Sequence, residues 1–153
     1  MANIVFNIAK GRVTELYNRV KSNDPANSAL ILVPIETAGL EADATLIDVD
    51  TLTALIAGAT NEQTTMGRKT LTDADLAALP APDDGNDRYD VSLPTVTWAA
   101  AAGNAISKIA VCYDSDTTGG TDANIVPLTM FDFAQTPSGA DIQMTGGVFH
   151  RAS

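Results

Sequence analysis

The chain of 153 residues contains a single cysteine, Cys112, and a single histidine, His150. One thiol cannot close a disulfide within the chain, and it cannot build a thiolate metal site without further sulfur ligands. Because the neighbouring residues Ile109, Val111 and Tyr113 are apolar, we predict that Cys112 is a core residue of a strand. The scarcity of cysteine also fits assembly in a reducing cytoplasm.

His150 is the only imidazole available for acid–base catalysis, and it lies close to the end of the chain. Chain ends are poorly ordered unless packing holds them, which disfavours a positioned catalytic base there. The sequence also lacks the G-x-S-x-G nucleophile motif and the common phosphate-binding glycine motifs. An acid-rich chain leaves paired carboxylates for glycoside cleavage open, but nothing in the sequence marks such a pair. We therefore predict that the protein is not an enzyme and needs no cofactor.

Positive charge is scarce, since nine Lys and Arg residues oppose nineteen Asp and Glu residues, for a formal net charge of −10. Nucleic acids and anionic membranes both bind cationic surfaces. No run approaches the ~20 apolar residues that cross a bilayer. The first residues also lack the pattern of a secretory signal. We therefore expect that the protein has no nucleic-acid partner and does not associate with membranes. We also expect that it is synthesised in a cytoplasm.

The few positive charges are unevenly placed. Residues 1–22 contain four cations and the single acid Glu15, whereas the remaining residues contain five basic and eighteen acidic side chains. A short cationic segment therefore precedes a strongly anionic remainder. The four cations are our candidate contacts with an acidic partner surface: Lys10, Arg12, Arg19 and Lys21.

The same segment has helical periodicity. Asn7 suits the N-cap position and residues 22–25, ending in Pro25, form a stop signal, which predicts a helix from about 8 to 22. One interpretation is an ordinary amphipathic helix packed on its own domain; the other is an arm whose cations meet an acidic partner. The domain prediction is a basic amphipathic arm at 1–25 and a β-rich domain at 26–153. The apolar positions fall on one face: Ala9, Val13, Leu16, Tyr17 and Val20.

The remainder alternates short apolar runs with turns rich in Gly, Pro, Asp and Asn. The run at 29–35 predicts a buried strand in which Pro34 marks an edge or an end, because proline donates no ladder hydrogen bond. A second helix is expected around 49–59, capped by Asp48 or Asp50 and ended by Gly58. These patterns predict an α+β, β-rich fold, an antiparallel β-sandwich or barrel-like domain with an N-terminal helix and a second short helix. Further strands are expected at 66–71, 89–93, 95–98, 105–113, 124–133 and 142–149.

The segment from Asp114 to Asp122 has acidic spacing that suggests a calcium loop. An EF-hand loop needs an acid or amide at its fifth position and an acid at its twelfth, whereas Thr118 and Ile125 stand there. We therefore predict a glycine-rich hairpin loop whose Asp side chains bond local backbone, with calcium as an open alternative. Asp83, Asp84 and Asp87 form a second acidic loop, which we interpret as a solvated turn.

Several turn and strand segments between residues 60 and 153 resemble small virion structural proteins of tailed bacteriophages. The segments are YDV at 89–91, VTW at 96–98, GNA at 103–105, VCYD at 111–114, IVPL at 125–128, FDF at 131–133, TPSG at 136–139 and GVFHR at 147–151. The resemblance implies a β-rich fold and a place on the virion, and it transfers no catalytic residue. Some such proteins are head decoration, or cement, proteins.

A decoration protein would bind the outside of the shell formed by the major capsid protein and stabilise it, with several copies associating there as a homo-oligomer. The alternatives are a tail or head–tail structural component, and a virion-surface module that binds the host or a carbohydrate. A carbohydrate module needs an exposed aromatic platform. Trp98 is the only tryptophan, and its place in an expected strand predicts a core residue instead.

Overall fold

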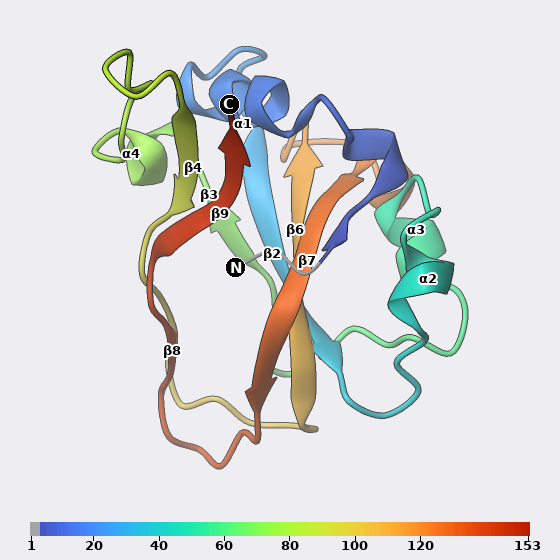
Figure 1. Ribbon diagram of the computed structural model, residues 1–153. Helices are drawn as coiled ribbons and strands as arrows, with labels where there is room; N and C mark the ends of the chain where they lie inside the picture. Colours follow the sequence, from blue (N-terminus) through green and yellow to red (C-terminus); the bar gives the residue numbers. More distant parts are fainter. Residues whose placement is uncertain (1–3) are drawn as a thin grey trace.

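The centre of the molecule is a five-stranded antiparallel sheet in the order β1-β7-β6-β2-β3 (Figure 1). The computed structural model describes residues 4–153. The long central strands are fixed by apolar pairs, such as Leu30 of β2 between Tyr113 of β6 and Leu71 of β3. The strands span Ile4–Val5 (β1), Ala29–Glu36 (β2), Lys69–Leu71 (β3), Ile106–Asp114 (β6) and Val126–Gln135 (β7).

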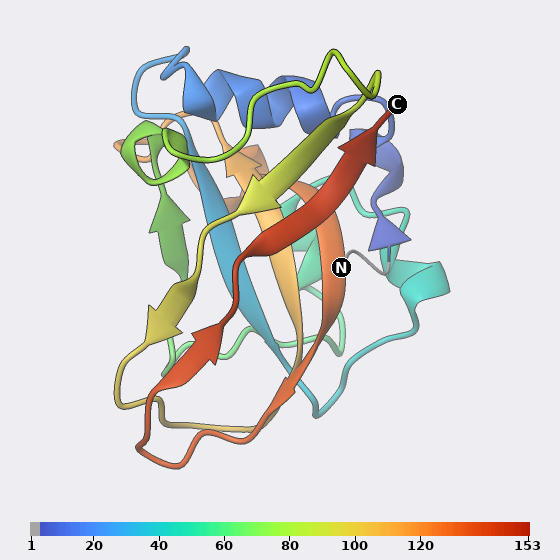
Figure 2. The same cartoon turned by 60° about the vertical axis from the view of Figure 1, so that its left-hand side comes forward.

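A long two-stranded ribbon lies over one face of this sheet (Figure 2). Its upper half pairs β4 (Tyr89–Leu93) with β9 (Gly147–Ala152), and its lower half pairs β5 (Val96–Trp98) with β8 (Ile142–Met144). The ribbon bends between the halves, where a Cβ on Gly146 would lie 2.7 Å from the Leu93 carbonyl oxygen. Glycine is therefore required there, because the two chains approach too closely for a side chain.

Short helices complete the other sides of the molecule. Helix α1 (Val13–Lys21) lies across one end, between the ribbon and the sheet (Figure 2). The face of the sheet away from the ribbon is covered by α2 (Asp43–Leu46) and α3 (Leu52–Leu55) (Figure 1). The 3-10 turn η1 (Asn7–Ala9) packs against β7, α4 (Asp73–Leu76) against α1, and η2 (Asp122–Asn124) against α3.

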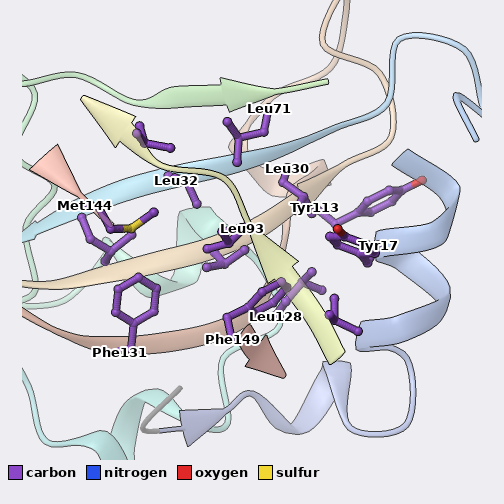
Figure 3. Close-up of a cluster of buried hydrophobic side chains, with 14 of the residues drawn as sticks. Tyr17, Leu30, Leu32, Leu71, Leu93, Tyr113, Leu128, Phe131, Met144 and Phe149 are labelled. Atoms are coloured by element: carbon purple, nitrogen blue, oxygen red, sulfur yellow. The ribbon is translucent and has the colours of Figure 1, made fainter. Parts of the chain in front are cut away.

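Both faces of the central strands are buried, so the molecule has two hydrophobic clusters. Successive residues of a strand point to opposite faces; Leu30 and Leu32 of β2 join the cluster under the ribbon, which Figure 3 shows around Tyr17 and Phe149. The intervening residues of β2 join the cluster under α2 and α3, together with Cys112. This arrangement explains the continuous apolar run, and it confirms the β-rich sandwich-like fold and the core position of Cys112.

Pro34 lies in β2 opposite Ile109 of β6. In an antiparallel ladder the N–H and C=O of one residue point to the same side. The Pro34 carbonyl accepts a hydrogen bond from the Gln63 backbone N–H at 2.9 Å, so the missing donor faces loop 61–63 rather than β6. Strand β3 ends opposite Leu32, and beyond it the bridge between Ile35 and Glu62 continues the pairing on this side. Pro34 therefore lies inside β2 rather than at its end or in an edge strand, and it is tolerated because no ladder hydrogen bond requires its missing donor.

Several predicted boundaries are wrong. The N-terminal helix begins at Val13 rather than residue 8, because Gly11 has φ +80° and separates it from η1. Asn7 does not cap it; its side-chain amide donates to Asp48. The second helix is a single turn, α3, whose cap is Thr51 rather than Asp48 or Asp50. The expected strand at 66–71 is only three residues long, and that at 142–149 is divided into β8 and β9.

Candidate functional site

Helix α1 carries the four candidate cations or lies beside them, and its sequence gives it two different faces. Val13, Leu16, Tyr17 and Val20 are spaced three or four residues apart, so they share one face, and each is at most 2% exposed. The opposite face contains Glu15 and Arg19, with Arg12 at the N-cap; these three side chains are about half exposed. The polar face is the side available to a partner.

The buried face of α1 belongs to the core of its own domain. The Tyr17 ring lies 6.2 Å from the Tyr89 ring in an edge-to-face arrangement and 6.1 Å from the Phe149 ring. Tyr89 donates a hydrogen bond from its hydroxyl to the Asn18 side chain at 2.9 Å. Burial raises the pKa of Tyr17 to about 12, with a smaller contribution from Tyr89.

These contacts correct the predicted domain division. Residues 4–25, the part of the predicted arm that the structure describes, do not form a separate arm, since α1 packs between the ribbon and the sheet and β1 is a strand of that sheet. Packing of the helix on its own domain, the other interpretation, is confirmed. The physical reason is that an amphipathic pattern shows that a face is buried, not which partner buries it. The apolar residues of α1 are therefore not available to anchor the protein to another molecule.

Lys21 is engaged within the chain. Its ammonium group donates to the carbonyl oxygens of Leu79 at 2.7 Å and Pro80 at 3.1 Å. These bonds fix the end of α1 to the segment that follows α4. The position of Lys21 in the last turn also suits the negative end of the helix dipole. Of the four candidate cations, Lys21 is thus the one with a structural role.

The other three candidates remain on the surface. Arg19 binds the Glu15 carboxylate at 2.9 Å, and Arg12 lies 3.9 Å from the same carboxylate. The hydrogen bond to Glu15 raises the pKa of Arg19 above its ordinary value. Lys10 is exposed in the turn before the helix. We call Lys10, Arg12, Arg19 and Glu15 the cationic face; it has three positive charges and one negative charge.

Two hollows flank this end of the molecule. A shallow hollow of about 370 Å³ is lined by Arg19, Glu15, Asp24 and two polar side chains, and therefore contains charges of both signs. A second, of about 480 Å³, is lined by Asp83, Asp84, Asp87, Arg88 and the chain end. Both are open to solvent, so neither encloses a small molecule in the way that an apolar ligand pocket does.

The loop from Asp114 to Asp122 bonds mainly to itself. Asp114 accepts from the Asp116 backbone N–H at 3.0 Å, and Asp116 accepts from the Thr118 backbone N–H at 3.0 Å. The hydrogen bonds from Thr118 lower the pKa of Asp116. Asp122 turns away to Arg68. The predicted local bonding is confirmed, and within residues 4–153 no three His, Cys, Asp or Glu side chains meet where they could hold a metal ion.

The sequence analysis missed a cluster centred on Arg68. Its guanidinium group binds the Glu62 carboxylate at 2.6 and 2.7 Å and the Asp122 carboxylate at 2.7 and 2.8 Å. The hydrogen bonds to these carboxylates raise the pKa of Arg68 and lower that of Asp122. We call these three residues the Arg68 clamp. No sequence signal connects partners that lie 54 positions apart.

The structure contradicts the argument made from the position of His150 and confirms the prediction made for Trp98. His150 lies in β9 opposite Val91, so packing does hold this end of the chain and the reason given above against a base there is wrong. Burial lowers the pKa of His150. Trp98 is 1% exposed and donates its indole N–H to the Gly67 carbonyl at 2.9 Å, which confirms it as a core residue. Within residues 4–153, the only large hydrophobic side chain classed as exposed is Val148.

Comparison with protein-family models, with curated proteins and with solved structures finds no match for this chain. A search for membrane spans finds no helix in residues 4–153 that is long and apolar enough to cross a bilayer.

Proposed function

We propose that this protein is a structural component of a tailed-phage virion that binds the outside of the major capsid protein shell and stabilises it. The observation that carries the proposal is the exposed cationic face at one end of a chain whose net charge is −10. An acidic shell repels most of such a molecule and attracts this face. Charge therefore selects the orientation in which the protein docks.

Attachment through the cationic face would depend on charged and polar contacts, because the apolar side of α1 is buried. Exposed ion pairs contribute only up to about 1 kcal/mol each. A repeated shell compensates for weak contacts, since linked copies bind together far more tightly than one copy does. Association of several copies on the shell is accordingly part of the proposal.

The test uses shells assembled without this protein and two variants with the same net charge. Lys10→Gln with Arg12→Gln removes two charges from the cationic face, giving −12 from −10. Thr53→Glu with Thr70→Glu, at two exposed threonines on other elements, also gives −12. Loss of two surface pairs predicts about tenfold weaker binding for the first variant only. Bound protein is measured by co-sedimentation with shells.

The salt dependence is part of the same measurement. Binding of the wild-type chain should weaken as salt rises, because mobile ions screen exposed charges. Equal loss of binding by both variants, or binding that ignores salt, would contradict a role for the cationic face. Binding to purified tails or connectors instead of shells would favour the tail or head–tail alternative. Deleting residues 1–22 is unsuitable as a test, because it removes four core side chains of α1.

A further inference from the structure

Two segments at one end of the molecule are nearly free of charge, although Glu36 of β2 accepts a hydrogen bond from Asn104 of the first segment at 2.9 Å and the Lys69 ammonium lies 6.0 Å from the Trp98 ring. We call residues 94–105 and 133–147 the uncharged tip; they form the lower half of the ribbon and the loops at the end away from α1 (Figure 1). These two segments contain a single charged residue, Asp141. Its carboxylate is turned onto the Ala100 backbone N–H, at 2.8 Å. The other twenty-seven of the chain's twenty-eight charged residues lie outside these two segments. The tip therefore has a much lower density of charged residues than the rest of the chain.

The outer surface of the tip carries neutral polar side chains. Thr97 of β5 lies opposite Gln143 of β8, and the Gln143 amide donates to the Thr97 hydroxyl at 3.2 Å. Both side chains are exposed, and Thr95 and Thr145 extend the same exposed set. The intervening residues of the two strands are buried beneath the ribbon. The side chains at the surface are thus presented by a well-anchored backbone.

The loops beyond these side chains add exposed methyl groups, and the strands beside them have edges without a pairing strand in the described part of the chain. Ala99, Ala100, Ala102 and Ala140 are exposed there. Within residues 4–153, β5 and β8 pair only with each other, so each has an unpaired edge. Of these features, the depletion of charge is the one that the centres of protein–protein interfaces share.

We propose that the uncharged tip binds the tip of a second copy of this chain. Two molecules of net charge −10 repel one another over most of their surfaces. In an interface between identical copies the same patch lies on both sides, so a charge at its centre would face its own like. A partner of opposite charge would instead gain from charged residues here. Absence of charge therefore favours a copy of the same chain.

The location of the tip keeps this interface separate from the cationic face. Helix α1 and the tip stand at opposite ends of the molecule (Figure 1), so occupation of one leaves the other accessible. Self-association through the tip does not depend on the proposed binding to a shell. The two interactions also respond to salt in opposite directions, because salt screens the repulsion between copies as well as the attraction to an acidic surface.

The experiment is sedimentation velocity on the full chain over a range of protein concentrations, at low and high salt. We expect the average mass to rise with concentration and to rise further with salt, since the screening length falls from about 10 Å at 0.1 M to about 3 Å at 1 M. A chain that stays monomeric at every concentration and salt level would overturn the proposal.

Two variants with equal charge locate the interface. Thr97→Lys with Gln143→Lys places cations on the tip, and Thr53→Lys with Thr70→Lys places them at the exposed threonines used above; each changes the net charge from −10 to −8. The first should raise the dissociation constant at least about tenfold, although its smaller net charge weakens overall repulsion. The second should not weaken association.

The result is decisive in each case. If the tip variant associated as strongly as the wild type, or if both variants lost association equally, the contact would lie elsewhere and the proposal would be overturned. Circular dichroism and thermal unfolding check that both variants are folded. If the ribbon substitutions unfold the chain, Ala102→Lys in the exposed loop tests the same surface without altering a strand, and the same tenfold loss is expected.

Discussion

The two faces of the central sheet are covered in different ways. Under the ribbon the cluster is rich in rings, which come from α1, the ribbon and the sheet: Tyr17, Tyr89, Trp98, Phe149, Tyr113 and Phe131. Figure 3 shows Tyr17, Phe149, Tyr113 and Phe131 among the aliphatic side chains. Under α2 and α3 the cluster is mainly aliphatic, with Phe6 as its only aromatic member within residues 4–153. A two-stranded ribbon is marginally stable by itself. Large rings that bury much area each are therefore needed to hold it.

The cluster under α2 and α3 is closed partly by hydrogen bonds and ion pairs. One-turn helices contribute little stability of their own, because helix nucleation is costly. The Arg68 clamp joins loop 61–68 to η2 and lies near Cys112. Cys112 is fully buried, and burial raises the pKa of its thiol to about 12. Where the covering elements are thin, a charged network thus takes part in closing the cluster.

Trp98→Ala tests the ribbon face and should have the largest effect. Removing a buried tryptophan costs about 3–5 kcal/mol through lost burial and a cavity, and here the hydrogen bond to the Gly67 carbonyl is lost as well. Urea unfolding followed by circular dichroism measures the change. Val148→Ala, at an exposed position of the same ribbon, should change stability by less than about 0.5 kcal/mol. Similar costs for both would show that the ribbon is not held by its rings.

Leu16→Ala tests whether α1 belongs to the ribbon side of the core. Leu16 is 2% exposed, and truncation of a buried leucine costs about 2–5 kcal/mol. Lys10→Ala, in the adjacent exposed turn, should stay within about 0.5 kcal/mol. The same urea titration serves both variants. If the Leu16→Ala chain were as stable as the wild type, the result would support the separate arm that the charge asymmetry suggested.

These elements also show how far sequence patterns reach. Alternation and apolar runs predicted the main strands, because burial of a strand depends on residues next to one another. The helix α1 was predicted from its spacing, but its partner was not, since the Tyr17–Tyr89 contact joins segments far apart in the chain. The turn α4 was missed although its signal was present: Thr72 and Asp75 form a capping box.

The candidate site was predictable only in part. Charge counting identified all four cations, yet nothing local distinguishes Lys21 from Lys10. Lys21 is engaged because the chain near Leu79 folds back against the end of α1, which is a long-range event. The Arg68 clamp has the same origin. Composition therefore predicts that charges are available, whereas the tertiary fold decides which of them remain available to a partner.

Arg68→Ala tests the helix face and should have the smallest effect of the three. Glu62 has only 9% of its side chain exposed, and a largely buried carboxylate left without its partner costs about 1–3 kcal/mol. Pairing Arg68→Met with Glu62→Gln removes that lone charge, and should recover part of the loss if the clamp acts through it. Urea unfolding of the single and double variants measures this coupling. An Arg68→Ala chain with unchanged stability would show that the aliphatic cluster closes this face without the clamp.

The clamp also predicts a dependence on pH that the aromatic face does not share. The hydrogen bond from Arg68 lowers the pKa of Asp122 in the folded chain, so this pairing adds stability above the unfolded pKa of about 3.9. That contribution is lost as pH falls through the lower, folded pKa, because protonation of Asp122 then becomes favourable in both states. The stability difference between wild type and Arg68→Ala should therefore be largest near neutral pH and shrink on acidification below about pH 4. The difference between wild type and Trp98→Ala should remain nearly constant over the same range, since no titrating group is removed with the indole. If both stability differences decreased together on acidification, the effect of acid would extend to the whole sheet and could not be assigned to the Arg68 clamp.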